Sequence, residues 1–287
     1  MSILNSLLML HRKHAAKKWY DQFKAERQPI INEVVSHAHL FPEQQEEINF
    51  LANNGADYFP YDWALDKHIN TIKGGTASFN GERLPYVFHN GKKLYMGVQP
   101  YSALLVEQMP HSPHRYFTNT FKPEKGDIFV DVGAAEGMIS LDAVDIVQKL
   151  YLIERDSSWL NSLQRTFAPY SAKTTIINKY ASDCNNDNNV TLDELLKYET
   201  APILLKMDVE GMEDVVLAGA TEILSRPTTK VAICTYHKSE DADRFIKQFH
   251  SMGYKTEQSE GYMFLMGQDG TYDFRKGMLR AWKPISE

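Results

Sequence analysis

The sequence predicts an α/β protein with a doubly wound, Rossmann-like sheet that carries helices on both faces. Residues 128–132 (IFVDV) form an apolar run broken only by Asp131, which is typical of a buried parallel strand. A turn bracketed by Gly133 and Gly137 follows, and a helix is expected over residues 138–147. Beyond this turn, strand and helix patterns alternate, as they do in parallel sheets.

The glycine turn predicts a nucleotide-binding corner, because glycine lets the backbone approach a ligand and the following helix points free amides at it. A dinucleotide-binding turn uses a third glycine, whereas this turn carries Glu136 where a pyrophosphate would lie. Glu154 ends the next apolar strand (150–153), about 20 residues after Gly133, where an acid meets ribose hydroxyls in Rossmann-type units. These acids favour S-adenosylmethionine, which is cationic and carries a ribose. The expected cofactor contacts are Asp131, Gly133, Ala134, Ala135, Glu136, Gly137 and Glu154, together with Ser182, Asp183 and Asp208 at later strand ends. A nicotinamide oxidoreductase is the rival enzyme class, disfavoured by the missing glycine and by Glu136.

Several segments resemble the FkbM family of S-adenosylmethionine-dependent methyltransferases. The strongest are residues 131–137 (DVGAAEG), 205–213 (LKMDVEGME) and 217–220 (LAGA), and the resemblance extends over roughly residues 105–283. Weaker matches are residues 107–108, 112–116, Trp159, 166–167, 236–238 and 274–277. Family members more often have Asn and Ile at the positions of Ala135 and Glu136, so the family's contacts there are not transferred. The resemblance implies a class I methyltransferase fold and O-methylation of a sugar or nucleotide-linked sugar, in surface-glycan (polysaccharide) or secondary-metabolite biosynthesis.

Composition excludes several other classes of function. The net charge is −6 and the pI about 5.9, so no general basic surface is available for nucleic acid. The two cysteines, Cys184 and Cys234, lie far apart without a metal-ligand pattern, which indicates a reducing compartment. No apolar run is long enough to span a membrane. We therefore expect a cytoplasmic protein with a small-molecule acceptor.

The N-terminal part predicts an appendage of helices and a β-hairpin. Residues 2–35 have apolar residues at helical spacing, with lysines and arginines on other faces. This pattern suits a helix that lies on a membrane surface, or an arm that packs on its own domain or on a second subunit. Another helix is expected over 42–51, ended by Gly55, and a hairpin over 86–96 with Asn90-Gly91 at its turn. The hairpin could contribute to a substrate lid. The predicted units are a helical arm (1–75), a hairpin and connector (76–110) and a methyltransferase domain (111–287).

Polar residues follow three later strands at the ligand-binding edge of the predicted sheet. Ser182 and Asp183, after a strand over 174–179, suit either an adenine contact or a polar turn. After the strand over 203–205, period-two alternation puts Lys206, Asp208 and Glu210 on one side. Asp208 and Glu210 could hold a divalent metal, but two carboxylates are a weak signature and no metal is predicted.

The strand over 231–234 delivers His237 to the same edge. We expect His237 to act as general base, with Asp208 orienting it and Glu210 as a further catalytic candidate. The alternative for His237 is a helix-capping or solvated residue.

Basic residues outside these strands are the candidates for acceptor binding. His114 and Arg115 lie before the glycine-turn strand, and the tail (254–283), predicted as an antiparallel hairpin, carries Arg275 and Lys276. This local basic charge suggests a phosphate-bearing acceptor. Two alternatives to sugar O-methylation stay open: methyl transfer to another small phosphorylated or N-acceptor metabolite, and a non-catalytic adenosyl-ligand-binding protein.

Overall fold

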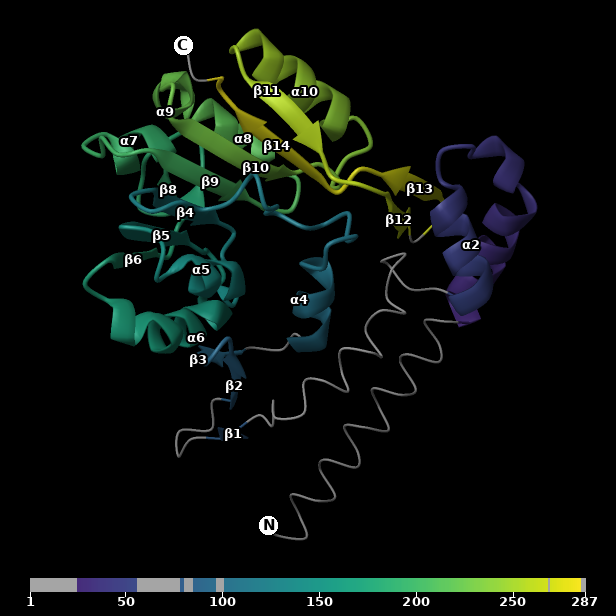
Figure 1. Ribbon diagram of the computed structural model, residues 1–287, viewed down its shortest axis with the longest axis horizontal. Coiled ribbons are helices and arrows are strands. Elements are labelled where there is room, and N and C mark those ends of the chain that lie inside the picture. The colour runs from purple at the N-terminus through teal and green to yellow at the C-terminus, as the bar shows by residue number, and fades with distance from the viewer. Residues whose placement is uncertain (1–24, 56–77, 80–84, 97–100, 268, 285–287) are drawn as a thin grey trace, which may run out of the picture.

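A seven-stranded sheet forms the centre of the protein (Figure 1). The structure is a computed structural model, and it describes residues 25–55, 78–79, 85–96, 101–267 and 269–284. The strand order is β11-β14-β10-β9-β4-β5-β6. The strands are β4 (Ile128–Val132), β5 (Lys149–Ile153), β6 (Thr174–Ile177), β9 (Ile203–Met207), β10 (Thr229–Cys234), β11 (Lys255–Gln258) and β14 (Met278–Trp282). Strands β6, β5, β4, β9 and β10 pair in parallel, and β14 is antiparallel to both of its neighbours. The predicted α/β sheet is confirmed.

Alternation along the buried strands divides the core into two layers, since successive side chains point to opposite faces of the sheet. Ile128, Val130 and Val132 pack with α7 (Leu192–Leu196), α8 (Glu213–Ala218), α9 (Thr221–Ser225) and α10 (Asp241–Ser251). Phe129 packs on the other face with α4 (Tyr101–Glu107), α5 (Met138–Ala143) and α6 (Ser157–Phe167). Helix α5 ends four residues earlier than predicted, and the side chain that caps α6 is Asp156, which accepts from the Ser158 amide.

The predicted hairpin is β2 (Pro85–His89) and β3 (Lys92–Tyr95), with positive φ at both Asn90 and Gly91. His89 Nε2 lies 2.8 Å from Asp142 Oδ1 on α5, and the Tyr95 amide donates to Thr166 Oγ1 on α6. The hairpin therefore packs on the helical layer beside α5 and α6. A short strand, β1 (Ser78–Phe79), adds to it.

The N-terminal helices pack against the C-terminal part of the chain. Residues 25–36 are helical and are followed by η1 (Ala38–Leu40) and α2 (Gln45–Asn54), which ends at Gly55 as predicted. Ile31, Val34, Ile48 and Leu51 form a cluster with Phe264 of β12 (Met263–Met266), which pairs with β13 (Tyr272–Arg275) (Figure 1). The predicted antiparallel tail hairpin is found as the pair of β11 and β14, but a second hairpin, formed by β12 and β13, is inserted between these two strands. The expectations for residues 2–24, including oligomerisation, lie outside the described residues.

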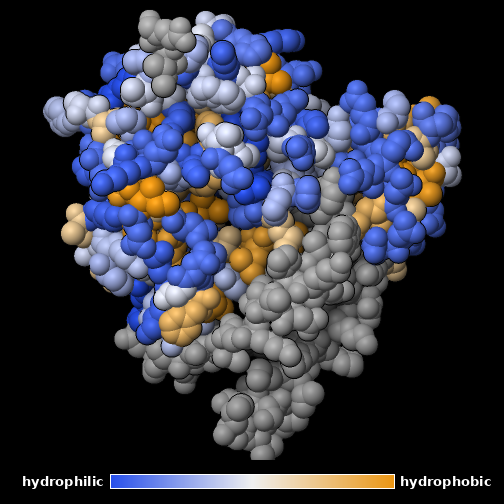
Figure 2. Space-filling model, viewed as in Figure 1, coloured by the Kyte–Doolittle hydropathy of each residue, from blue (hydrophilic) through white to orange (hydrophobic). Residues whose placement is uncertain are grey.

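Smaller elements complete the described chain. They are η2 (Ala168–Tyr170), β7 (Tyr180–Ala181) and β8 (Asn189–Val190), of which β7 and β8 pair with each other. The surface seen in Figure 2 is mainly hydrophilic where it is described, with apolar residues in small areas. Among the helices of the described ranges, none combines the length and the apolar composition that a membrane span requires.

Candidate active site

A cavity of about 1110 Å³ opens at the carboxyl ends of β4, β5, β9 and β10. Open α/β sheets bind ligands at this edge, where the strand order reverses. Its wall comes from the glycine turn, from the ends of these strands, from α4 and from the segment before β4. This volume is at the upper end of small-molecule sites, so a cofactor and a small acceptor can both enter.

The glycine turn packs tightly against the end of β9. Gly133 has φ +76°, and a Cβ there would lie 1.9 Å from the backbone oxygen of Asp208, so only glycine fits. The Ala135 amide donates to Glu154 Oε2 at 2.9 Å, and Glu154 Oε1 accepts from the Asp156 amide at 2.7 Å. Gly133, Ala134, Ala135, Glu136 and Glu154 all line the cavity. Gly137 does not, because it faces Leu163 and Phe167 of α6.

Asp131 and Lys206 form a buried ion pair beneath the turn. Lys206 Nζ lies 3.0 Å from Asp131 Oδ1 and donates to the Gly133 carbonyl at 2.6 Å, and Ser140 donates to Asp131 Oδ2. Burial alone would lower the pKa of Lys206, but the charges of Asp131 and Asp208 raise it above its usual value. The charge of Asp131, predicted as a cofactor contact, is therefore balanced inside the protein, and the pair ties β4 to β9.

Glu136 places a buried carboxyl group in the cavity wall. Only 6% of the residue is exposed. Burial raises the pKa of Glu136 to about 7, Lys206 partly offsets this, and the charges of Glu107 and Asp131 add to it. A cation bound in the cavity would favour the ionised form of Glu136, whereas an anion would oppose it.

Asp208, at the end of β9, is the centre of a polar cluster in the cavity. Tyr116 donates a hydrogen bond to Oδ2 at 2.6 Å, and His114 Nε2 lies 3.4 Å from the same oxygen. The Tyr236 hydroxyl donates to Oδ1 at 3.3 Å. Burial alone would raise the pKa of Asp208, but His114, Lys206 and Tyr116 hold it well below its usual range. Asp208 is therefore a carboxylate at neutral pH.

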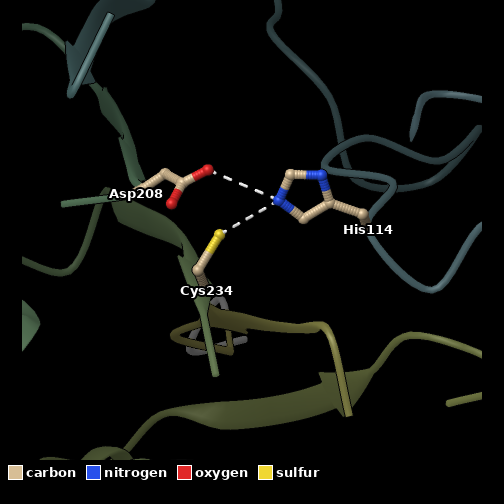
Figure 3. Close-up of side chains that lie close together, drawn as sticks. All are labelled: His114, Asp208 and Cys234. Atoms are coloured by element: carbon tan, nitrogen blue, oxygen red, sulfur yellow. Dashed lines mark hydrogen bonds and ion pairs between the residues drawn. The ribbon is translucent and has the colours of Figure 1, made fainter. Parts of the chain in front are cut away.

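His114 reaches this cluster from the segment before β4, as Figure 3 shows. The side chain is buried, lines the cavity and has Cys234 Sγ at 3.5 Å and Glu107 Oε2 at 3.6 Å. Burial alone would lower the pKa of His114, but Cys234, Asp208 and Glu107 around the ring hold it well above its usual value. His114 lines the cavity, so its predicted contact with the acceptor stays a prediction.

His237 lies behind the cavity wall, on the side of α8. Its Nδ1 lies 3.1 Å from Glu213 Oε1, and its Nε2 lies 3.5 Å from Asp208 Oδ1. Burial alone would lower the pKa of His237, but Glu213 and Asp208 raise it above its usual value. Glu210, with φ +54°, has a side chain that is 91% exposed at the cavity rim, 3.6 Å from His237 Nε2. Both candidates are near Asp208, but only Glu210 lines the cavity.

Ser182 and Asp183 separate in the structure. Ser182 is buried and lines the cavity, whereas Asp183 is exposed and does not. The Ser182 carbonyl packs so closely on Gly219 that a Cβ there would lie 1.9 Å from it. The adenine contact expected at this position can therefore come from Ser182 but not from the Asp183 carboxylate.

The other predicted acceptor-binding residues do not line this cavity. Arg275 pairs with Asp273 at 2.8 Å and donates to the carbonyls of Tyr236 and His237. Lys276 donates to the Gly261 carbonyl and lies 3.9 Å from the centroid of the Tyr262 ring. Arg115 also does not line the cavity. Arg275 and Lys276 are held by contacts within the protein, so the tail does not present a free basic surface to a phosphate.

Sequence reasoning missed several residues of the cluster. Tyr116 and Tyr236 donate to Asp208, Glu107 faces His114, and Glu213 faces His237. Tyr116 belongs to the segment 112–116 that carried part of the resemblance, and this was the available signal. Glu213 reads as an ordinary acid in the first turn of a helix, which favours negative charge.

Comparison with known proteins gives a family and several structural neighbours. The model of the methyltransferase FkbM domain matches residues 80–256. A methyltransferase FkbM from Methylobacillus flagellatus KT is 20% identical, with a TM-score of 0.46 over 80% of this chain and 63% of that chain. A precorrin-6y C5,15-methyltransferase from Geobacter metallireducens is 13% identical, with a TM-score of 0.40 over 56% of this chain and 83% of that chain. A search of curated proteins found no match.

Proposed function

The chain belongs to the FkbM methyltransferase family, and we propose that it transfers the methyl group of S-adenosylmethionine to a hydroxyl of a small sugar-like acceptor. The observation that carries this proposal is the cavity itself, which is lined by the glycine turn, by Glu154 and by Asp208. The nucleotide-linked form of the acceptor loses its main support, because Arg275 and Lys276 lie outside the cavity.

The residues at the glycine turn fit S-adenosylmethionine. Gly133 to Ala135 present backbone at the cavity wall, and Glu154 is fixed there by two backbone amides. The buried Glu136 carboxyl group would gain from a positively charged ligand and lose from a pyrophosphate. When bound, S-adenosylmethionine supplies a methyl group on a positively charged sulfur. Glu154 would accept hydrogen bonds from its ribose, and Glu136 would offset its positive charge.

Asp208 is the group that we assign to the acceptor hydroxyl. It lines the cavity, is ionised, and has Oδ2 held by Tyr116 while Oδ1 makes only the longer contacts with Tyr236 and His237. Oδ1 can therefore orient a hydroxyl and accept its proton. A carboxylate of low pKa suffices for this, because the hydroxyl becomes strongly acidic as its oxygen forms the new bond to carbon.

The two histidines act on Asp208 and do not replace it. The general-base role expected for His237 is not retained in this proposal, since His237 does not line the cavity and its raised pKa favours the protonated ring. His114 lines the cavity, but its pKa is also raised. Both rings instead keep Asp208 ionised and oriented, and we assign them as positioning residues.

The proposal is tested with methyl-labelled S-adenosylmethionine and a panel of free sugars, nucleotide sugars and small amines, with products identified by mass. We expect a free sugar to become heavier by one methyl group. Asp208→Asn should lower kcat by ~10²–10⁴-fold with cofactor affinity retained. The matched control is Asp183→Asn, which changes an exposed carboxylate at the same sheet edge. Methylation of an amine alone, cofactor binding without any turnover, or full turnover by Asp208→Asn would contradict the proposal.

A further inference from the structure

We propose that Asp208, Glu213 and His237 form a binding site for a divalent transition-metal ion beside the cavity. The site shares Asp208 with the proposed acceptor position, and only its effect on turnover rests on the function proposed above. Strand β9 ends directly before Asp208, Glu213 begins helix α8, and His237 follows strand β10, so three neighbouring elements bring the side chains together.

The distances suit coordination of a metal ion. One ligand atom from each of the three residues lies within 4.8 Å of the other two. His237 Nδ1 lies 3.1 Å from Glu213 Oε1, and His237 Nε2 lies 3.5 Å from Asp208 Oδ1. Bonds of about 2.0–2.2 Å to one metal place neighbouring ligand atoms about 3 to 3.5 Å apart. An ion binds only one of the two ring nitrogens, so the side chains must move closer together for one atom from each of the three residues to share the ion.

Buried atoms without hydrogen bonds point to a ligand in this cluster. The side chain of His237 is 9% exposed, and neither ring nitrogen makes a hydrogen bond to another described residue. The side chain of Glu213 is 1% exposed, and its Oε2 is also without one, whereas Oε1 is oriented by the Val209 amide at 3.0 Å. The ring nitrogens contact carboxylates only as ion pairs, and Glu213 Oε2 has no hydrogen bond, although buried polar atoms nearly always have such partners. A metal ion bound to one ring nitrogen and to Glu213 would give both of these groups a partner.

The local charge also favours a dication. Three carboxylates, from Asp208, Glu210 and Glu213, lie within 3.6 Å of the ring nitrogens of His237. The nearby Lys206 ammonium is already paired with Asp131. A single proton on His237 balances one of the three negative charges, whereas a divalent ion balances two and leaves the imidazole neutral, as a metal ligand must be.

The donor set indicates the class of metal. One imidazole nitrogen with two carboxylates suits Mn²⁺, Fe²⁺, Co²⁺ or Zn²⁺, whereas Mg²⁺ and Ca²⁺ prefer oxygen ligands alone. A second group, His114 with Asp208 and Cys234 (Figure 3), is also compact, but His114 Nε2 already has hydrogen-bond partners in Cys234 and Tyr116, whereas the ring nitrogens of His237 have none among the described residues. Cys234 Sγ also donates to Met278 Sδ. We therefore assign the ion to the cluster that contains Glu213.

The experiment measures metal binding by the full chain without cofactor or acceptor. Chelator-treated protein is titrated with Mn²⁺, followed by electron paramagnetic resonance, and with Co²⁺, followed by its visible absorption. We expect one ion per chain and at least about tenfold weaker binding in Glu213→Gln. The control is Asp214→Asn, which removes the neighbouring carboxylate that pairs with Arg244 and leaves the three ligands intact.

Several results would overturn the proposal. They are no binding of either ion by the wild type, equal binding by Glu213→Gln, or a Co²⁺ spectrum without a nitrogen ligand. If Glu213→Gln does not fold, His237→Gln is titrated instead, and unchanged binding there overturns the site as well. Metal binding without methyl transfer would support this site and refute only the proposed function. Methyl transfer by a protein that binds no metal would refute this site and leave the proposed function intact.

Discussion

Replacing Glu136 with glutamine should make the protein more stable at alkaline pH. Burial raises the pKa of Glu136 from 4.5 to about 7 in the folded protein. A raised pKa means that the contribution of this group to stability is present below pH 4.5 and is lost as the pH rises through 7. A pKa difference of about 2.5 units between the folded and unfolded protein changes the free energy of unfolding by about 3 kcal/mol, since one pKa unit corresponds to about 1.4 kcal/mol. Glutamine does not ionise, so Glu136→Gln should be more stable by about 3 kcal/mol at pH 8 and by less than about 1 kcal/mol at pH 5.

Denaturant unfolding at the two pH values measures this difference, and calorimetry measures the effect on cofactor binding. We expect Glu136→Gln to bind S-adenosylmethionine at least tenfold more weakly, a loss of about 1.4 kcal/mol, because it removes the charge that faces the cation. Glu210→Gln is the matched control, since it removes a charge from the same cavity wall but from a side chain that is 91% exposed. Its stability should change by less than about 0.5 kcal/mol. Equal effects of Glu136→Gln at pH 5 and pH 8, or a loss of stability at pH 8, would refute the reasoning.

Three further changes test other parts of the site. Gly133→Ala would place a Cβ 1.9 Å from the Asp208 carbonyl oxygen, so denaturant unfolding should show that the free energy of unfolding falls by about 2–5 kcal/mol. Gly253→Ala is the control, because Gly253 has a similar φ but open space around it, and its free energy of unfolding should fall by only about 1–2 kcal/mol. Equal losses in the two variants would contradict the close packing. Glu154→Gln should weaken S-adenosylmethionine binding by about 1–3 kcal/mol in calorimetry, and an unchanged Kd would place the ribose elsewhere. Arg275→Ala should raise the acceptor KM equally for phosphorylated and phosphate-free acceptors, because Arg275 donates hydrogen bonds to the carbonyls of Tyr236 and His237. An effect confined to phosphorylated acceptors would instead support a basic acceptor site.

The elements predicted well were those whose signals are contiguous in the chain. Strand β4, its glycine turn and strand β5 were found because buried parallel strands are apolar runs and the turn needs glycine. The hairpin was found because Asn90 and Gly91 both adopt the positive φ that its turn requires. These features depend on local chemistry alone, so one sequence contains them.

The Asp208 cluster was predicted only in part, because its partners come from distant segments. Tyr116 donates to Asp208 across 92 positions of the chain, and no local pattern contains that contact. His237 was placed correctly beside Asp208, but its neighbour Glu213 was not recognised, so the effect of that carboxylate on the pKa of His237 could not be anticipated.

The tail shows a different kind of error. Arg275 and Lys276 read as a free basic cluster because a sequence displays charge but not its partners. In the structure both side chains donate to backbone carbonyls. Arg275 is the last residue of β13, and both β13 and its partner strand β12 pack against the N-terminal helices. A sequence pattern for this packing was not available, since the apolar residues concerned lie near opposite ends of the chain.

Calorimetric titration with S-adenosylmethionine, compared with NAD at the same concentrations, tests the central claim most directly. The glycine turn, the buried Glu136 and the fixed Glu154 carboxylate should bind the cationic cofactor saturably, with one molecule per chain, and should not bind the pyrophosphate of NAD. Tighter binding of NAD, or no binding of S-adenosylmethionine, would contradict the account.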